Sequence, residues 1–197
     1  MGCARVIFGF TTRWTAPAAN RTLLYVISPN LTILIVEDSP EDQILIRRAF
    51  ETCGHDKIHL QIVSGGSEAI DYLKGAGKFA DRAAFPFPTL VMSDLKMQQG
   101  DGFSILEFLH QTPEARVIPV FILSGSADTD DIRRAYALGA SGYLTKPRSL
   151  AEIKSLVRII VELSLVCELP PMTESGVALK TESSGKLGER FVRTPAA

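Results

Sequence analysis

The chain has 197 residues, a length typical of one domain or of one domain with terminal extensions. Its 21 lysine and arginine residues nearly balance 22 aspartate and glutamate residues, giving a net charge of −1, which disfavours a nucleic-acid-binding protein. Hydrophobic residues make up 46% of the chain, enough to build a core. No apolar run reaches the roughly 18 residues of a membrane-spanning helix, so a spanning protein is excluded.

The three cysteines, Cys3, Cys53 and Cys167, lie far apart and form no C-x-x-C pair. This pattern favours neither a disulfide framework nor a zinc site. The three histidines also lack the spacing of metal ligands and are interpreted as ordinary surface or strand residues. A reducing cytoplasm is the expected location.

The two ends of the chain differ in composition from its middle. Residues 1–30 carry three arginines and no acidic residue, and we interpret them as a poorly ordered arm. Residues 170–197 open with two prolines and contain few apolar residues, which predicts a disordered tail. The intervening segment, 31–169, has 14 basic and 19 acidic residues, a net charge of −5, and this charge disfavours direct DNA binding.

Apolar runs and amphipathic stretches alternate along residues 31–169. Strands are expected at 31–36, 58–62, 89–93, 119–123 and 142–145, the first as a run buried on both faces of a parallel sheet. Capping residues, prolines and helical periodicity predict helices over 39–54, 68–74, from Gly102 through Leu109, over 128–138 and over 149–168. Five strand–helix units indicate a doubly wound α/β fold, a five-stranded parallel sheet with helices on both faces.

Polar residues stand where the predicted strands end. The first strand runs into Glu37 and Asp38, the third into Asp94, the fourth into Ser124 and the fifth into Lys146. Doubly wound sheets bind their ligands outside the carboxyl ends of the strands, so these side chains are expected at one rim. Taken singly, each has an ordinary explanation as a turn, cap or surface residue. Their combined placement favours a functional site.

Clustered carboxylates repel one another by several kcal/mol, about 4 kcal/mol per pair at 4 Å, unless they hold a proton or a cation. Oxygen ligands with open positions suit Mg²⁺. A carboxylate beside that ion can act as a nucleophile toward phosphorus, and the hydroxyl and ammonium can bind phosphoryl oxygens. The pattern therefore predicts a magnesium-dependent phosphoryl site.

Four segments resemble the receiver domain of bacterial two-component response regulators, across nearly all of residues 31–169. They are ILIVEDSP (33–40), MSDLKMQQGDG (92–102), FILSG (121–125) and GASGYLTKP (139–147). The resemblance implies a flavodoxin-like sheet with strand order 2-1-3-4-5. The long connection from Gly75 to Pro88 and the segment 143–150 are similar to the stand-alone regulators paired with bacterial phytochrome kinases.

The resemblance also implies roles for individual residues. Asp94 would be the phosphoacceptor, and Ser124 and Lys146 would contact the phosphoryl group. Glu37, Asp38, Asp94 and the Lys96 carbonyl would hold Mg²⁺, and Tyr143 resembles the aromatic switch residue of the family. The Lys146–Pro147 peptide matches one that is usually cis in the family. Gln98 departs from the family pattern, in which proline usually stands at this position, so a less rigid loop is expected there.

The implied function is that of a single-domain response regulator, which takes a phosphoryl group from a sensor histidine kinase and alters a protein-binding face for a downstream partner. Slow loss of the phosphoryl group is expected, because neither Lys96 nor Ser126 is an acid or carboxamide that could position water. Leu156, Ile159, Leu163 and Val166 form an apolar stripe on the last helix, with a homodimer seam and a broad buried face as alternatives.

Two other classes stay open at this point. A receiver-like interaction module that never carries phosphate is one, although the acidic, hydroxyl and lysine positions are all retained. A metal-dependent phosphatase with an aspartyl nucleophile is the other. Such an enzyme commonly has a second aspartate two residues after the nucleophile, where this chain has Lys96.

Overall fold

The computed structural model describes residues 31–54, 58–98, 100–113 and 115–167. The proposed arm, and the tail from residue 170, lie outside these ranges. Within them, five parallel strands form one sheet in the order β2-β1-β3-β4-β5, which confirms the predicted fold class and strand order. The strands are β1 (Leu31–Val36), β2 (Ile58–Val63), β3 (Leu90–Asp94), β4 (Val120–Ser124) and β5 (Gly142–Thr145).

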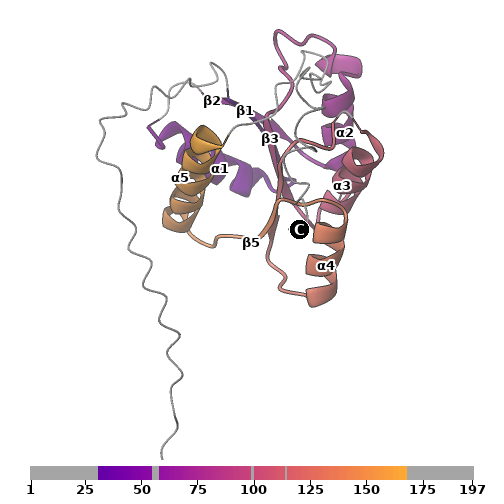
Figure 1. Cartoon of the computed structure of the whole chain (residues 1–197). Coiled ribbons are helices and arrows are strands. Elements are labelled where there is room, and N and C mark those ends of the chain that lie inside the picture. The colour runs from indigo at the N-terminus through magenta and orange to yellow at the C-terminus, as the bar shows by residue number, and fades with distance from the viewer. Residues whose placement is uncertain (1–30, 55–57, 99, 114, 168–197) are drawn as a thin grey trace, which may run out of the picture.

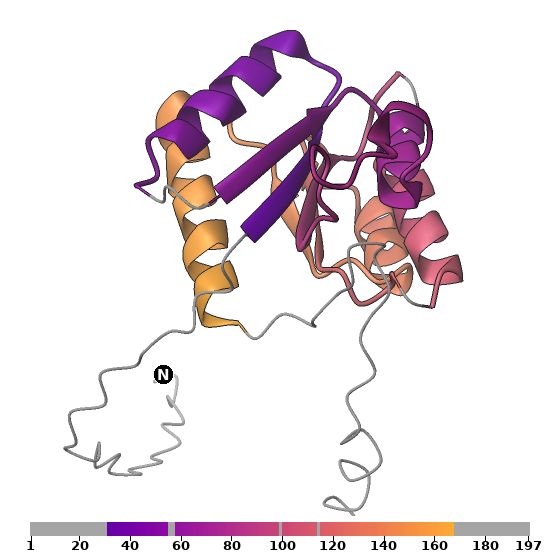
Figure 2. The same cartoon turned by 90° about the horizontal axis from the view of Figure 1, so that it is seen from above.

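Helices cover both faces of the sheet (Figures 1 and 2). One layer contains α1 (Pro40–Glu51) and α5 (Leu150–Val166), and the other contains α2 (Gly66–Lys74), α3 (Gly102–Gln111) and α4 (Thr129–Ala137). Alternate residues of β1 serve the two layers: Ile33 and Ile35 belong to the core beneath α1 and α5, and Leu34 and Val36 to the core beneath α2 and α3. A strand buried on both faces explains the continuous apolar run.

The helix starts follow the capping signals of the sequence. Ser39, Asp101, Asp128 and Ser149 each accept a hydrogen bond from a backbone N–H in the first turn of the helix that follows. The predicted start of the second helix at residue 68 is wrong by two residues, because α2 begins at Gly66 without a side-chain cap. Elsewhere the boundaries shift by a few residues, with β3 and β4 each one position later than expected.

The start of α2 depends on a contact that is distant in sequence. The N–H of Gly66 donates to the carbonyl of Gly100, at 3.2 Å. A Cβ atom at residue 66 would lie 2.9 Å from the carbonyl oxygen of Asp101 and 3.1 Å from the carbonyl carbon of Gly100, so a side chain there would displace the loop that follows β3. This close approach fixes α2 against the loop that carries part of the candidate site.

The long connection between α2 and β3 is tied to the end of α2. It opens with the short 3-10 turn η1 (Gly77–Phe79). The Arg82 guanidinium donates hydrogen bonds to the carbonyls of Tyr72 and Leu73, both at 2.9 Å. The Tyr72 ring packs against the rings of Phe79 and Phe85, with centroids 5.0 and 6.2 Å away. Aromatic packing and a charged cap for the helix carbonyls thus order the connection.

Among the described residues, no helix combines the length and the apolar character that crossing a bilayer requires.

Candidate functional site

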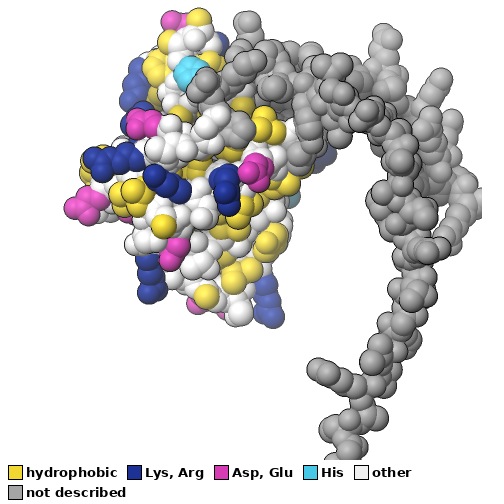
Figure 3. Space-filling model, turned by 90° about the vertical axis from the view of Figure 1, so that its left-hand side faces the viewer, with side chains coloured by type: hydrophobic (Ala, Val, Ile, Leu, Met, Phe, Trp, Pro, Cys, Tyr) yellow, Lys and Arg dark blue, Asp and Glu magenta, His cyan; other side chains and the backbone are white. Residues whose placement is uncertain are grey.

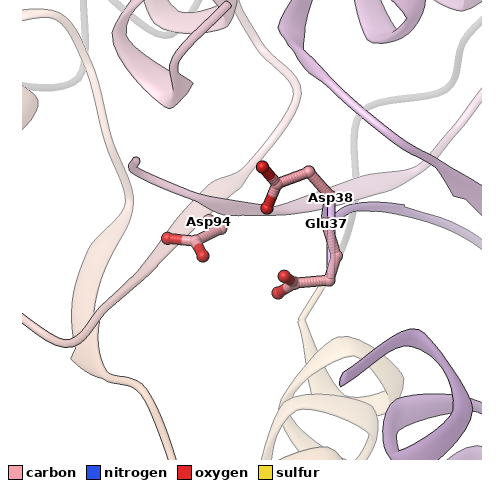
Figure 4. A group of neighbouring side chains, drawn as sticks. All are labelled: Glu37, Asp38 and Asp94. Atoms are coloured by element: carbon pink, nitrogen blue, oxygen red, sulfur yellow. The ribbon is translucent and has the colours of Figure 1, made fainter. Parts of the chain in front are cut away.

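Three carboxylates from the ends of β1 and β3 form a compact group. Glu37, Asp38 and Asp94 each offer an oxygen, and these oxygens all lie within 4.8 Å of one another. Figure 4 shows the three side chains beside one another at the ends of the two strands, with the Glu37 and Asp38 carboxylates pointing toward Asp94. The strands are neighbours in the sheet, so the register alone brings the side chains together. The three acidic residues predicted as metal ligands are therefore adjacent.

Glu37 is the most buried member of the group, with 1% of its surface exposed. Its Oε1 accepts a hydrogen bond from the N–H of Ser39 at 3.1 Å, and its Oε2 lies 2.8 Å from the Lys146 Nζ. Burial raises the pKa of the Glu37 carboxyl, although the nearby Lys146 ammonium favours the charged form. Three carboxylates whose oxygens lie within 4.8 Å of one another repel one another and supply the hard oxygen ligands of a divalent cation, so the residues present fit a divalent metal ion.

The Lys146 ammonium lies among three carboxylates. Its Nζ is 2.7 Å from Oδ2 of Asp94, 2.8 Å from Oε2 of Glu37 and 2.8 Å from Oδ2 of Asp42. Burial by itself lowers the pKa of Lys146, but the contacts with Asp42, Asp94 and Glu37 outweigh it and leave the pKa above its usual value. The lysine is therefore charged throughout the physiological pH range and carries a positive charge to the phosphoacceptor candidate.

Two backbone N–H groups of the loop after β3 bind the carboxylates. The N–H of Lys96 donates to Oδ1 of Asp94 at 3.2 Å, and the N–H of Gln98 donates to Oδ2 of Asp38 at 2.9 Å. The second hydrogen bond is specific to a chain without proline at residue 98, because proline has no N–H. The expected loss of loop rigidity at Gln98 is thus countered by a direct contact with a ligand candidate. The Lys96 carbonyl stays a predicted ligand.

Ser124 connects the site to the loop between β4 and α4. The residue is 2% exposed, and its carbonyl accepts from the N–H of Lys146 at 2.8 Å. Its Oγ accepts from the N–H of Ser126 at 3.1 Å, and the carbonyl of Ser126 accepts from the hydroxyl of half-buried Tyr143 at 3.1 Å. The predicted hydroxyl, lysine and switch tyrosine are therefore joined through consecutive short contacts.

Two features of the site differ from the sequence interpretation. Asp42 contacts Lys146 directly, whereas the sequence indicated only an acidic residue in the first turn of a helix. The described residues contain no cis peptide bond, so the cis Lys146–Pro147 peptide that the resemblance suggested is not observed.

The doubly wound sheet, the carboxylate triad and the lysine and hydroxyl beside it define the receiver class of signalling domains. Residues 33–158 match the family model for the response regulator receiver domain, and the chain belongs to this family. Its function is accordingly that of a response regulator in a phosphorelay.

Among the relatives of this chain are stand-alone response regulators. Response regulator Rcp1 of Synechocystis is 33% identical over 131 residues, which cover 66% of this chain and 86% of Rcp1. The Mn²⁺-bound structure of Rcp1 aligns with a TM-score of 0.63 at 32% identity, covering 72% of this chain and 99% of that one.

Two further solved structures are each 31% identical to this chain, and each alignment covers 72% of this chain and 99% of the solved one. They are response regulator RPA3017, in red light signalling of R. palustris, with a TM-score of 0.67, and the phosphorylated cyanobacterial phytochrome response regulator RcpA, with a TM-score of 0.66. The sub-family suggested by the sequence, the stand-alone phytochrome response regulators, is confirmed as the group of its relatives.

Proposed function

We propose that Asp94 accepts a phosphoryl group from the phosphohistidine of a sensor histidine kinase. The observation that carries this proposal is the contact of Asp94 with Lys146, at 2.7 Å, inside a group of three converging carboxylates. A carboxylate that faces an ammonium and a cation site is poised as a nucleophile toward phosphorus. The solved structure of RcpA, which is phosphorylated, supports the same chemistry.

The transfer exchanges one bond to phosphorus for another. A carboxylate oxygen of Asp94 forms the new P–O bond while the P–N bond to the donor imidazole breaks, and its electron pair stays on the imidazole nitrogen. The product is an aspartyl phosphate, an acyl phosphate. Lys146 and Ser124 balance charge and donate hydrogen bonds to the phosphoryl oxygens.

We propose Mg²⁺ as the ion held by Glu37, Asp38, Asp94 and the Lys96 carbonyl. When bound, it neutralises negative charge on the transferring phosphoryl oxygens. Three carboxylates with oxygens within 4.8 Å offer the hard ligands that this ion prefers. The Mn²⁺ bound in the structure of Rcp1 supports a divalent ion at the carboxylates of this chain.

Phosphorylation is then transmitted through Ser126. A phosphoryl group adds about 1.5 to 2 negative charges and attracts the Ser124 hydroxyl, which in the present structure accepts from the Ser126 N–H. Movement of Ser124 breaks that hydrogen bond and displaces the carbonyl that Tyr143 binds. The Tyr143 side chain then turns inward and reshapes the surface of α4, β5 and α5, where a downstream protein binds.

The partners follow from the relatives and the charge. Phytochrome regulators among the solved relatives favour a phytochrome-type histidine kinase, and the acidic described segment favours a protein target over DNA.

The cytoplasm is the proposed compartment, in keeping with the free thiols of Cys53 and Cys167. A homodimer through α5 is also proposed, since Ile159 and Leu163 are exposed.

Transfer of label from a radiolabelled kinase tests the proposal. Wild-type protein should take up one phosphoryl group per chain, and Asp94→Asn should take up none. An Asp94→Asn protein labelled at the wild-type rate would refute the assignment. If wild-type protein takes up no phosphoryl group from any candidate kinase or from acetyl phosphate, the result would favour the interaction module. Repeated turnover of a phosphate ester would favour the phosphatase.

A further inference from the structure

The third carboxylate at Lys146 lies outside the group of three that fits a metal ion. Asp42 belongs to the first turn of α1, and its Oδ2 is 2.8 Å from the Lys146 Nζ. The metal-binding group contains Glu37, Asp38 and Asp94. Asp42 is thus the one carboxylate around Lys146 that is not a ligand candidate.

This difference matters because the ammonium shares its other two partners with the cation site. Glu37 and Asp94 both face Lys146 and both belong to the metal-binding group. A cation bound by Glu37 and Asp94 would neutralise part of their negative charge and so weaken their attraction for the lysine ammonium. The attraction from Asp42 persists in that situation, because its carboxylate is a separate charge on α1.

The surroundings of the pair favour a strong contact. Asp42 and Lys146 line a small pocket whose other walls are apolar, formed by Ile46, Met92, Leu123, Pro147, Ile153, Leu156 and Val157. Apolar neighbours lower the local dielectric and strengthen an ion pair relative to one in water. The exposed fractions of the two side chains are 35% for Asp42 and 22% for Lys146, so water screens the pair only partly.

The Lys146 ammonium can contact Asp42 and Asp94 at the same time. An ammonium has three donor hydrogens, and its distances to Asp42 and Asp94 are nearly equal. A lysine side chain has a flexible four-carbon stem and loses rotamer entropy when its end is fixed at one point. A second carboxylate on a packed helix offsets that loss, since α1 packs against α5. Lys146 itself follows directly after β5, in the connection that leads to α5.

We propose that Asp42 is a positioning residue that holds the Lys146 ammonium beside Asp94, so that the charge is in place before the phosphoryl group arrives. This inference rests on the proposed function, in which Asp94 is the phosphoacceptor. Asp42 itself touches neither the phosphoryl group nor the metal and acts through the lysine.

Glu41, on the same turn of α1, provides a control for a purely structural role of Asp42. Asp42 and Glu41 both place a negative charge at the N-terminal end of α1, where it stabilises the helix. Glu41 is exposed and forms no ion pair within the described residues. Asp42→Asn and Glu41→Gln therefore each remove one charge from the helix end. Asp42→Asn also removes the ion pair with Lys146, so it should lower the melting temperature more than Glu41→Gln.

The test is the initial rate of phosphoryl loading from acetyl phosphate at saturating Mg²⁺, followed by intact-protein mass spectrometry. Asp42→Asn should slow loading by about three- to tenfold, in the lower part of the range of coupling between contacting residues, and Glu41→Gln should stay within about twofold of wild type. In a Lys146→Met background, Asp42→Asn should cause no further loss. Asp42→Glu, which keeps the charge, should restore part of the rate.

Four outcomes would overturn the inference. One is equal loading by Asp42→Asn and Glu41→Gln, which would reduce Asp42 to a helix-end charge. Another is the same proportional loss in the Lys146→Met background, which would show that Asp42 does not act through the lysine. Wild type that never loads would overturn this inference together with the proposed function, whereas normal loading of both wild type and Asp42→Asn contradicts this inference alone.

Discussion

The Tyr143 hydroxyl donates a hydrogen bond to the Ser126 carbonyl, with 3.1 Å between the two oxygens. The same residue, Ser126, donates its N–H to Oγ of Ser124. One residue of the β4–α4 loop therefore contacts both the hydroxyl proposed to bind phosphate and the tyrosine proposed to switch. The side chain of Tyr143 is half-buried against the core beneath α2 and α3, so it contacts both the loop and the core.

Tyr143→Phe tests this connection, because it keeps the ring and removes the hydroxyl. We expect a loss of about 1 kcal/mol in the free energy of unfolding, the usual value for one hydrogen bond. Hydrogen exchange should become faster at the amides of Ser126 and Asp128. Tyr136→Phe is the control: its hydroxyl accepts from the Tyr143 N–H, outside the β4–α4 loop. Equal exchange at Ser126 in both variants would contradict the connection.

Gln98 provides a test of how the loop orients a metal ligand. Its N–H donates to Oδ2 of Asp38, and Gln98→Pro removes this donor whereas Gln98→Ala keeps it. We expect Gln98→Pro to weaken Mg²⁺ binding by about tenfold, as other contacts that orient metal ligands do, and Gln98→Ala to bind normally. Titration calorimetry measures both affinities. Identical affinities in the two variants would show that the hydrogen bond has no role.

The lifetime of the phosphorylated state should depend on Lys96. Its ammonium is 3.6 Å from Oδ2 of Asp131 on α4, and 69% of its side chain is exposed, so the ion pair contributes little to stability. Lys96→Asn introduces a carboxamide that can orient water, and we expect it to lose phosphate severalfold faster than wild type. Lys96→Met removes the charge without adding a carboxamide. Decay of Lys96→Asn at the rate of Lys96→Met would count against this explanation.

The exposed part of α5 carries the dimer hypothesis. Ile153, Val157 and Ile160 are buried against the sheet, whereas Ile159 and Leu163 are 57% and 42% exposed. Figure 3 shows hydrophobic side chains among charged ones on the side of the molecule that carries α1 and α5.

Leu163→Glu should convert a dimer into a monomer, because it places a charge in the seam. The molar mass from light scattering measures the change, and Lys154→Glu, a charge change elsewhere on the same helix, should leave the mass unaltered. An unchanged mass in Leu163→Glu would reject the seam.

The fold was predictable because its signals are local. Each capping residue fixes a helix start through a bond to the next turn, and the apolar runs show which strands are buried on both faces. The start of α2 was missed since it depends on the approach of Gly66 to Gly100, which no pattern within residues 65–74 encodes.

The site was predictable to the extent that strand ends share one rim. That rule brought Glu37, Asp38, Asp94 and Lys146 together before any coordinates. It could not identify Asp42, because an acidic residue in a first turn has the same sequence signature whether it stabilises the helix end or contacts a lysine. Nor could it show the Gln98 contact, which is made by a backbone N–H and leaves no mark in residue type.

The central claim is that Asp94 carries the phosphoryl group. Borohydride reduces an aspartyl phosphate to homoserine, so peptide mapping of protein loaded with acetyl phosphate and Mg²⁺ identifies the modified residue directly. We predict homoserine at position 94 alone, and none when Mg²⁺ is withheld. Homoserine at a different aspartate, or phosphate that survives borohydride on a serine or threonine, would contradict the claim.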